Sequence, residues 1–260
     1  MIILLNFLFE KMETLPKDIY FTLAKDMEIR DLINFCVAYK RANEKICKND
    51  DVWRYRLNKE FSNWKDFNLN KSPFDTYVFL YQLKILKKKS KSSKSIFDLY
   101  NKKVFSLSNK ALVEIPKEID NLSNLQELYL TDNFLEKIPK KIDNLSNLQV
   151  LHLSNNNLIE IPKEIGNLSN LQRLDLSNNQ LTKIPKTIGN LSNLQLLRLH
   201  NNQLTKIPKT IGNLSKLQEL PLSNNQLTTI PKEIGNLSNL QSLYLCNNQL
   251  EVIPKDQSVA

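Results

Sequence analysis

The chain has 260 residues, a formal net charge of +9 and 41% hydrophobic residues. This length predicts one long domain and a smaller one, and the basic excess is too mild to require nucleic acid as a partner. The three cysteines, Cys36, Cys47 and Cys246, are odd in number and form no C-x-x-C motif, which excludes a disulfide framework and favours a reducing, intracellular location.

Residues 1–13 are expected to be an extension ahead of the first domain. Ile2 to Phe9 is apolar, but it is far shorter than the roughly 20 residues that a membrane-spanning helix needs. It has no basic start and no small-residue cleavage site, so we expect neither a membrane anchor nor a signal peptide. Met12 offers an alternative start of translation, in which case residues 1–11 would not belong to the native protein.

Residues 14–61 predict a small all-α domain. Thr14 can cap a first helix because its hydroxyl accepts a bond from a free backbone N–H, and Pro16 fits the first turn. Further helices are expected to begin near residues 30, 43 and 50. The last of them carries the apolar residues Val52, Trp53 and Leu57.

This stretch resembles the F-box. The matching residues are Leu15-Pro16, Ile19, Asp31-Leu32, Val37, Lys40-Arg41 and Trp53-Arg54. The resemblance implies docking on a Skp1-like adaptor through Leu15, Pro16, Ile19, Leu32, Val37 and Trp53. The alternative is a helical cap that covers the open end of the domain that follows.

Residues 62–101 are expected to join the two domains. Apolar residues at helical spacing predict a helix from Phe74 to Lys89. They are Phe74, Tyr77, Val78, Tyr81 and Ile85. The basic stretch from Lys87 to Lys94 predicts a solvated linker, with a nuclear-localisation signal as the alternative. Residues 96–105 are expected to lead into the next domain and to cover its core.

From residue 102 to residue 260 the chain repeats with a period of 23 residues. The copies begin at Lys102, Leu125, Leu148, Leu171, Leu194, Leu217 and Leu240, and the first and last are atypical. They share the pattern L-x-x-L-x-L-x-x-N-x-L-x-x-I-P-x-x-I-x-x-L-x-x. Self-similarity at a short, fixed period predicts a solenoid.

Each repeat is expected to contribute one short strand to a parallel sheet. In the copy from Leu171, the alternation places Leu174 and Leu176 inside and Asp175 outside. The ninth position holds Asn133, Asn156, Asn179, Asn202, Asn225 and Asn248. An amide has two donors and an acceptor, so we expect it to bond the backbone above and below the bend after each strand. The Ile-Pro segment that follows predicts an extended stretch on the convex side.

The repeat resembles the intracellular, 23-residue form of the leucine-rich repeat. The resemblance implies an α+β solenoid, a horseshoe with its parallel β-sheet on the concave face, preceded here by the small all-α F-box-like domain. An F-box followed by leucine-rich repeats is a familiar order, and the chain also resembles such proteins of large DNA viruses.

The outward strand positions form three columns. The first holds Glu127, Val150, Arg173, Leu196, Glu219 and Ser242; the second Tyr129, His152, Asp175, Arg198, Pro221 and Tyr244; the third Thr131, Ser154, Ser177, His200, Ser223 and Cys246. The first two columns vary while the framework stays constant, which favours a binding surface over structural drift. The expected target-binding residues are Glu127, Tyr129, His152, Arg173, Asp175, Arg198 and Tyr244.

Four further features have local consequences. Lys110 replaces the ninth-position Asn of the first copy, which should therefore be irregular. Pro221 removes one sheet donor, so the strand ladder should break there. No capping segment covers Leu240 and the leucines after it, which predicts fraying or pairing at that end. A lysine recurs at the sixteenth position; an acidic partner is possible, but a row that keeps the convex side soluble is the favoured interpretation.

The sequence predicts a non-enzymatic protein without cofactor or metal. His152 and His200 lie more than one coil apart, no Cys/His set has ligand spacing, and no glycine-rich phosphate loop exists. The resemblance implies the substrate-recognition subunit of an SCF-type ubiquitin ligase, with Skp1 at one end and a protein target on the concave face. The alternative is a scaffold without ligase activity, such as a regulator of a small-GTPase pathway. Neither interpretation involves a small-molecule substrate, nucleic acid or a membrane.

Overall fold

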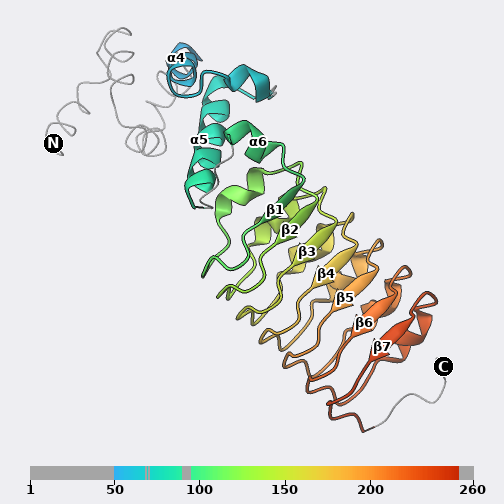
Figure 1. The fold of residues 1–260 in the computed structure, drawn as a ribbon. Helices are drawn as coiled ribbons and strands as arrows, with labels where there is room; N and C mark the ends of the chain where they lie inside the picture. Colours follow the sequence, from blue (N-terminus) through green and yellow to red (C-terminus); the bar gives the residue numbers. More distant parts are fainter. Residues whose placement is uncertain (1–49, 68, 70, 90–94, 252–260) are drawn as a thin grey trace, which may run out of the picture. The chain divides into compact units, whose positions relative to one another are not determined.

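The structure, a computed structural model, describes residues 50–67, 69, 71–89 and 95–251 (Figure 1). The chain divides into two compact units, residues 1–84 and 85–260, and the boundary falls within one helix. The helices expected between residues 14 and 49 lie outside the described residues. The domain boundaries at residues 13, 61 and 101 stay predictions.

The first unit contains the predicted helix near residue 50. Helix α4 spans Asp50–Glu60, with two aspartates in its first turn that complement the positive helix end. It buries Val52, Trp53 and Leu57, as expected. A short 3-10 helix, η3, follows at Trp64–Phe67.

Helix α5 spans Pro73–Lys89 and confirms the helix predicted from residue 74. Its start is fixed by Ser72, whose hydroxyl accepts from the backbone N–H of Asp75 at 3.1 Å. No residue of the predicted apolar stripe is exposed, and Tyr77 among its five members is fully buried. The buried apolar positions are Pro73, Tyr77, Phe79, Leu80, Leu83 and Leu86. The helix is apolar on most sides, so periodicity alone could not select its buried face.

In the second unit, helix α6, Ile96–Tyr100, precedes the sheet. Ser95 and Asp98 form a reciprocal capping box at its start, in which each side chain accepts from the other's backbone N–H. Leu99 is fully buried, and the expected cover of the first repeat's core by residues 96–105 stays a prediction.

Seven strands form one parallel sheet in chain order, β1 to β7 (Figure 1). They are β1 Val104–Ser106, β2 Glu127–Tyr129, β3 Val150–His152, β4 Arg173–Asp175, β5 Leu196–Arg198, β6 Glu219–Pro221 and β7 Ser242–Tyr244. Each strand pairs with the residues one period later, for example Leu151 with Leu174. The central leucine of β2 to β6 is fully buried, as the alternation predicts.

The return side of each coil differs from the prediction. The Ile-Pro segment is extended, but a five-residue 3-10 helix follows each proline. These helices are η4 Lys117–Asn121, η5 Lys140–Asn144, η6 Lys163–Asn167, η7 Lys186–Asn190, η8 Lys209–Asn213 and η9 Lys232–Asn236. Each opens with an i to i+3 bond, such as Ile188 N to Pro185 O at 3.0 Å. The sixteenth-position lysine is their first residue; Lys255 lies outside the described residues.

The buried asparagines satisfy the bend after each strand. Nδ2 of Asn202 donates to Leu199 O at 3.1 Å in its own coil and to Leu176 O at 3.0 Å in the preceding coil. Its Oδ1 accepts from Leu181 N, also in the preceding coil, at 3.0 Å. The same pattern holds from Asn133 to Asn248. The expected bonds to both neighbouring coils are therefore corrected, because each amide reaches only backward.

The first coil is irregular, as predicted. One residue with positive φ precedes the buried asparagine position in every coil, such as Asn178 at 53°, but the first coil adds Ala111 at 52°. Since Lys110 supplies no amide there, Oδ1 of Asn133 accepts from both Lys110 N and Leu112 N, each at 3.0 Å.

The ladder breaks at Pro221, as predicted. Strands β5 and β6 share a single registered pair, Leu196 with Glu219, whereas the neighbouring strands share three. In the last coil, Leu240, Leu243 and Leu245 are partly exposed, although their equivalents one coil earlier are fully buried. Fraying or pairing at this end stays a prediction.

Candidate functional site

The sheet register aligns the predicted outward columns. Glu127, Val150, Arg173 and Leu196 pair in succession, and so do Tyr129, His152, Asp175 and Arg198. Because successive residues of a strand alternate between faces, both columns lie on the face opposite the buried leucines. The sequence therefore positioned these side chains correctly, although it could not show which of them touch.

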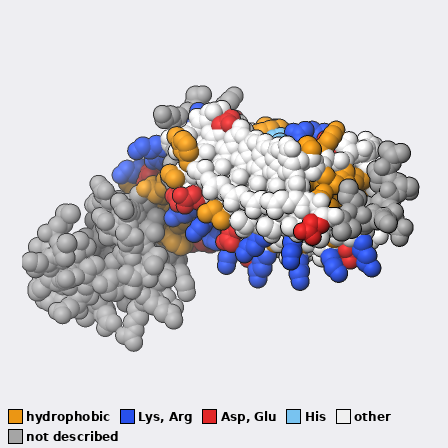
Figure 2. All heavy atoms as spheres, turned by 90° about the horizontal axis from the view of Figure 1, so that it is seen from below, with side chains coloured by type: hydrophobic (Ala, Val, Ile, Leu, Met, Phe, Trp, Pro, Cys, Tyr) orange, Lys and Arg blue, Asp and Glu red, His pale blue; other side chains and the backbone are white. Residues whose placement is uncertain are grey.

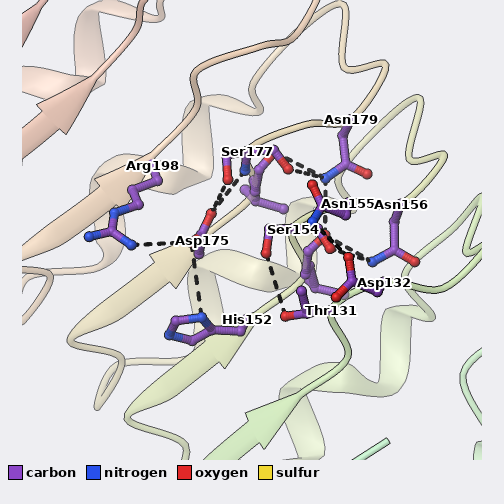
Figure 3. Close-up of polar contacts among 12 residues, drawn as sticks. Thr131, Asp132, His152, Ser154, Asn155, Asn156, Asp175, Ser177, Asn179 and Arg198 are labelled. Atoms are coloured by element: carbon purple, nitrogen blue, oxygen red, sulfur yellow. Dashed lines mark hydrogen bonds and ion pairs between the residues drawn. The ribbon is translucent and has the colours of Figure 1, made fainter. Parts of the chain in front are cut away.

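Asp175 is the centre of a polar cluster on this face (Figure 3). Its Oδ1 accepts from the backbone N–H and the hydroxyl of Ser177, at 3.0 and 2.6 Å. Its Oδ2 lies 3.5 Å from Nη1 of Arg198 and 3.9 Å from Nδ1 of His152. Asp175 is only 6% exposed, so the Ser177 bonds and the Arg198 ion pair offset the cost of burying its charge.

His152 and Tyr129 form the neighbouring part of the face. Their ring centroids are 5.0 Å apart with an interplanar angle of 37°. Burial lowers the pKa of His152; Asp175 opposes this shift, and the positive Arg198 and Arg173 add to it. The Tyr129 hydroxyl donates to Oε2 of Glu127 at 2.7 Å, and this bond is the main cause that raises the pKa of Tyr129.

The structure thus brings five predicted residues into one contiguous group. We name Glu127, Tyr129, His152, Asp175 and Arg198 the concave cluster. Arg173 is exposed beside it, and among the described residues it forms no ion pair. Tyr244 is 56% exposed, but it lies two strands from Arg198 and does not join the group.

Sequence reasoning missed two polar contributions. It placed Ser177 in an outward column without recognising that it anchors Asp175. It also overlooked the positive-φ residues, whose side chains link neighbouring coils: Asn155 Nδ2 donates to Asp132 Oδ1 at 2.7 Å (Figure 3), and Asn201 to Asn178 at 2.6 Å. The sequence pattern was interpreted at the buried position alone, although Asn or Asp recurs at the position before it in all seven copies.

The other predicted site lies mostly outside the described residues. This holds for Leu15, Pro16, Ile19, Leu32 and Val37. Trp53 is described and is fully buried, with its ring centroid 4.9 Å from that of Phe74 and 5.3 Å from that of Tyr77. In this conformation Trp53 stabilises the helical unit, and a docking role for it stays a prediction.

Two kinds of feature are absent from the described residues. No group of three His, Cys, Asp or Glu side chains there is arranged to hold a metal ion. None of the described helices has the length and apolar character needed to cross a membrane. What the face offers is hydrogen bonds, ion pairs and ring contacts.

Comparisons with known proteins match the repeats. The family model described as "Leucine-rich repeat region" matches residues 140–252, and "Leucine Rich Repeat" matches residues 124–145. No curated protein matches the chain.

Solved structures of other repeat proteins are also similar. A leucine-rich repeat protein of Leptospira interrogans is 36% identical, over 61% of this chain and 52% of that one, with a TM-score of 0.48. The ectodomain of the Arabidopsis thaliana receptor kinase GASSHO1/SCHENGEN3, solved with CASPARIAN STRIP INTEGRITY FACTOR 2, is 41% identical over 56% of this chain and 17% of that one, with a TM-score of 0.48. The chain thus spans about half of the first protein's length and less of the second's.

Proposed function

Because residues 124–252 of this chain are leucine-rich repeats, we propose that it is a protein-binding module whose concave face holds a protein partner. Leucine-rich repeat proteins generally mediate protein–protein interaction. One observation carries the assignment to this face: the inward positions are leucine in coil after coil, while the outward columns differ at nearly every strand. A concave solenoid surface that varies on a constant framework is suited to recognising one partner.

The energetics of the face support the same assignment. Tyrosine and arginine dominate the energetics of protein interfaces, and Tyr129, Arg173, Arg198 and Tyr244 all stand in the outward columns. Arg198 is already held by Asp175, so less side-chain freedom is lost when a partner binds.

Site-directed photo-crosslinking tests this function. A photo-reactive phenylalanine analogue replaces Leu196, which is half-buried on the concave face, and in a matched variant it replaces the exposed Lys232 at the start of η9. Full-length protein is irradiated in an extract of the cells that produce it. We expect a discrete adduct from position 196 and none from position 232. Equal capture at both positions, or none at position 196, would contradict the proposal.

We further propose that the module serves as the substrate-recognition subunit of an SCF-type ubiquitin ligase. The support is the F-box-like pattern at Leu15-Pro16, Ile19, Asp31-Leu32 and Trp53-Arg54, which precedes the repeats in the chain. In this role the chain supplies no reacting group. It brings a target close to a conjugating enzyme, so the chemistry resides in its partners. Cysteine usage supports an intracellular setting for this role.

A pull-down of the full chain with purified Skp1 tests the ligase role. Replacing Leu15 and Pro16 by Ala should abolish retention, whereas Lys25→Ala, in the same stretch but outside the pattern, should retain wild-type binding. Circular dichroism confirms that each variant is folded. If folded wild-type protein does not retain Skp1, the ligase role is wrong and the chain is a scaffold without it.

A further inference from the structure

Positive charge is concentrated in two central coils of the solenoid. Residues 171–216 contain seven Lys or Arg and one Asp, a formal charge of +6. The coils before them, residues 102–170, contain eight Lys and nine Asp or Glu, and residues 217–260 contain two Lys and four Asp or Glu. The two central coils are therefore strongly basic between a nearly neutral and a mildly acidic flank. A local field of this kind raises the encounter rate with an oppositely charged partner.

The lysines of this region lie away from the concave columns. Figure 2 shows a row of basic side chains along one edge of the solenoid, with acidic side chains among them. At the ends of the central pair of coils, Lys183 lies 3.8 Å from Glu160 and Lys209 lies 3.8 Å from Glu233. These exposed pairs partly neutralise the edge, and such pairs contribute little binding geometry. The edge therefore adds to the field without forming a defined site.

The two arginines differ from the lysines in position, because they lie in the outward strand columns, and in how far acidic side chains neutralise them. Arg173 on β4 is exposed and, in the part of the chain that the structure describes, has no acidic partner within ion-pair distance. Arg198 on β5 has one contact to the buried Asp175, which orients its guanidinium and leaves its other donors available. Asp175 itself is buried, is bonded by Ser177 and is paired with Arg198, so it presents little negative charge to a partner.

The spacing of the two arginines matches an extended polypeptide. They are one strand apart across the sheet and two residues apart along it, because Arg173 pairs with Leu196 and Asp175 with Arg198. With strands about 4.8 Å apart and a rise of about 3.3 Å per residue, their Cα atoms are roughly 8 Å from each other. Side chains at positions i and i+2 of an extended peptide emerge on one side about 6.6 Å apart. Each carboxylate of such a pair can accept two bonds from one guanidinium.

We propose that Arg173 and Arg198 bind an extended acidic segment of the protein partner, with carboxylates at alternate positions. This inference rests on the proposed binding function of the concave face and specifies the chemistry of the partner there. The acidic part is short, since Glu127 and Glu219 stand in the same columns on either side and repel a longer polyanion. Beyond it, the paired rings of Tyr129 and His152 offer an apolar contact.

Fluorescence anisotropy with the full-length protein tests the charge requirement. The probe is a labelled nine-residue peptide of β-branched and glycine residues with Glu-Val-Glu at its centre; its control has Gln-Val-Gln. We expect at least tenfold tighter binding of the Glu probe at low ionic strength, weakening as salt is added. Equal binding of the two probes overturns the inference.

Two variants with the same change in net charge test the location. Arg173→Gln should weaken Glu-probe binding about tenfold, whereas Lys206→Gln, at an exposed position of the same two coils outside the outward columns, should weaken it less than twofold. Arg173→Lys should fall between wild type and Arg173→Gln, because it keeps the charge but loses the two-pronged bond. Equal losses at positions 173 and 206 would mean that only the general field attracts the probe, which overturns the site.

Failure of this inference can be told from failure of the binding function. A partner crosslinked at position 196 whose contact segment carries no acidic residues would leave the binding function intact and refute the acidic segment. Absence of any crosslinked partner refutes the binding function itself.

Discussion

From the third coil to the seventh, two neighbouring asparagines have different physical roles. The first adopts positive φ, which asparagine tolerates better than most residues, and its side chain links to the same position of the neighbouring coil. The second is buried and replaces the hydrogen bonds that a sheet or helix would give the bend. Asparagine thus permits a positive φ at one position of the repeat and satisfies buried backbone groups at the next.

Asn202→Ala should destabilise the protein by about 3 kcal/mol, because it leaves buried backbone groups of two coils without partners. Urea unfolding measures the change. Asn193→Ala is the matched control: that residue is half-buried at the surface, its Nδ2 donates to Ser169 O and its Oδ1 accepts from Nζ of Lys216, and the change should cost below about 1 kcal/mol. Similar losses of unfolding free energy in the two variants would show that the buried amide contributes no more to stability than a surface amide.

Asp120 should make stability depend on pH. It occupies the position of the later glycines, and one carboxylate oxygen is buried without a partner. Burial, with smaller contributions from Asp143 and Glu118 and opposition from Lys141, raises its pKa from 3.8 to about 6. The folded state therefore binds the proton more tightly than the unfolded state, so this group reduces stability as pH rises from about 4 through about 6.

Asp120→Asn should remove that dependence. The variant should gain about 1 kcal/mol over wild type at pH 7.5, a discounted figure since solvent reaches the carboxyl, and nothing at pH 4. Thermal melts at both pH values measure the difference. A gain that is the same at both values would assign the effect to packing and not to charge.

At the scale of the element, the 3-10 helices show how closely the coils approach. A Cβ added to Gly189 would lie 2.4 Å from the carbonyl oxygen of Thr210 in the next coil. The helices η6 to η9 pack tightly, whereas η4 and η5, where aspartate replaces glycine, pack less closely. Glycine is needed at this position because the next coil lies too close for a Cβ atom. Its φ is not positive, so backbone conformation does not require it.

Gly189→Ala should cost about 2 kcal/mol, because backbone atoms cannot yield to the added methyl as a flexible side chain would. Without the clash, the same substitution in a helical conformation would stabilise by about 0.5 kcal/mol, because it lowers the entropy of the unfolded chain. The sign of the change in unfolding free energy therefore shows whether the clash exists. Chemical denaturation provides the measurement. A stabilised variant would contradict the close approach.

At the scale of the whole molecule, much of the repeat domain follows from the sequence. The period fixed the strands, their register and the buried leucines, since each repeat can bury its apolar side only on the next one. The 3-10 helices were missed because a five-residue segment is too short to show its own periodicity. The buried face of α5 could not be selected from the sequence, because apolar residues lie on most sides of the helix. The contacts of Asp175 depend on rotamers and distances across three strands, which no spacing rule contains.

Pro221 weakens the pairing between strands β5 and β6. The missing N–H removes a ladder bond worth about 1 kcal/mol, but proline also restricts the unfolded chain by a similar amount, so total stability is a poor readout. Local opening is a better one. Hydrogen exchange should be about tenfold faster at Leu199, whose N–H donates to Pro221 O, than at Leu174 and Leu176, because strands β5 and β6 are held by one registered pair.

Pro221→Val restores the donor and should reduce this difference in exchange to below about threefold. Exchange at Leu174 and Leu176 serves as the internal reference in both proteins. If the difference persists unchanged in the variant, it arises from the position of these coils in the stack and not from the proline.

Because each buried amide bonds the preceding coil, the order of synthesis decides when each coil can complete its hydrogen bonds. A ribosome releases the chain from its amino end, so each coil emerges before the asparagine that will complete its hydrogen bonds. A newly made coil must wait for the next 23 residues before its bend is satisfied. Assembly during translation therefore lags one repeat behind synthesis, and a pause within a repeat leaves the coil before it as the open, unsealed end of the growing protein.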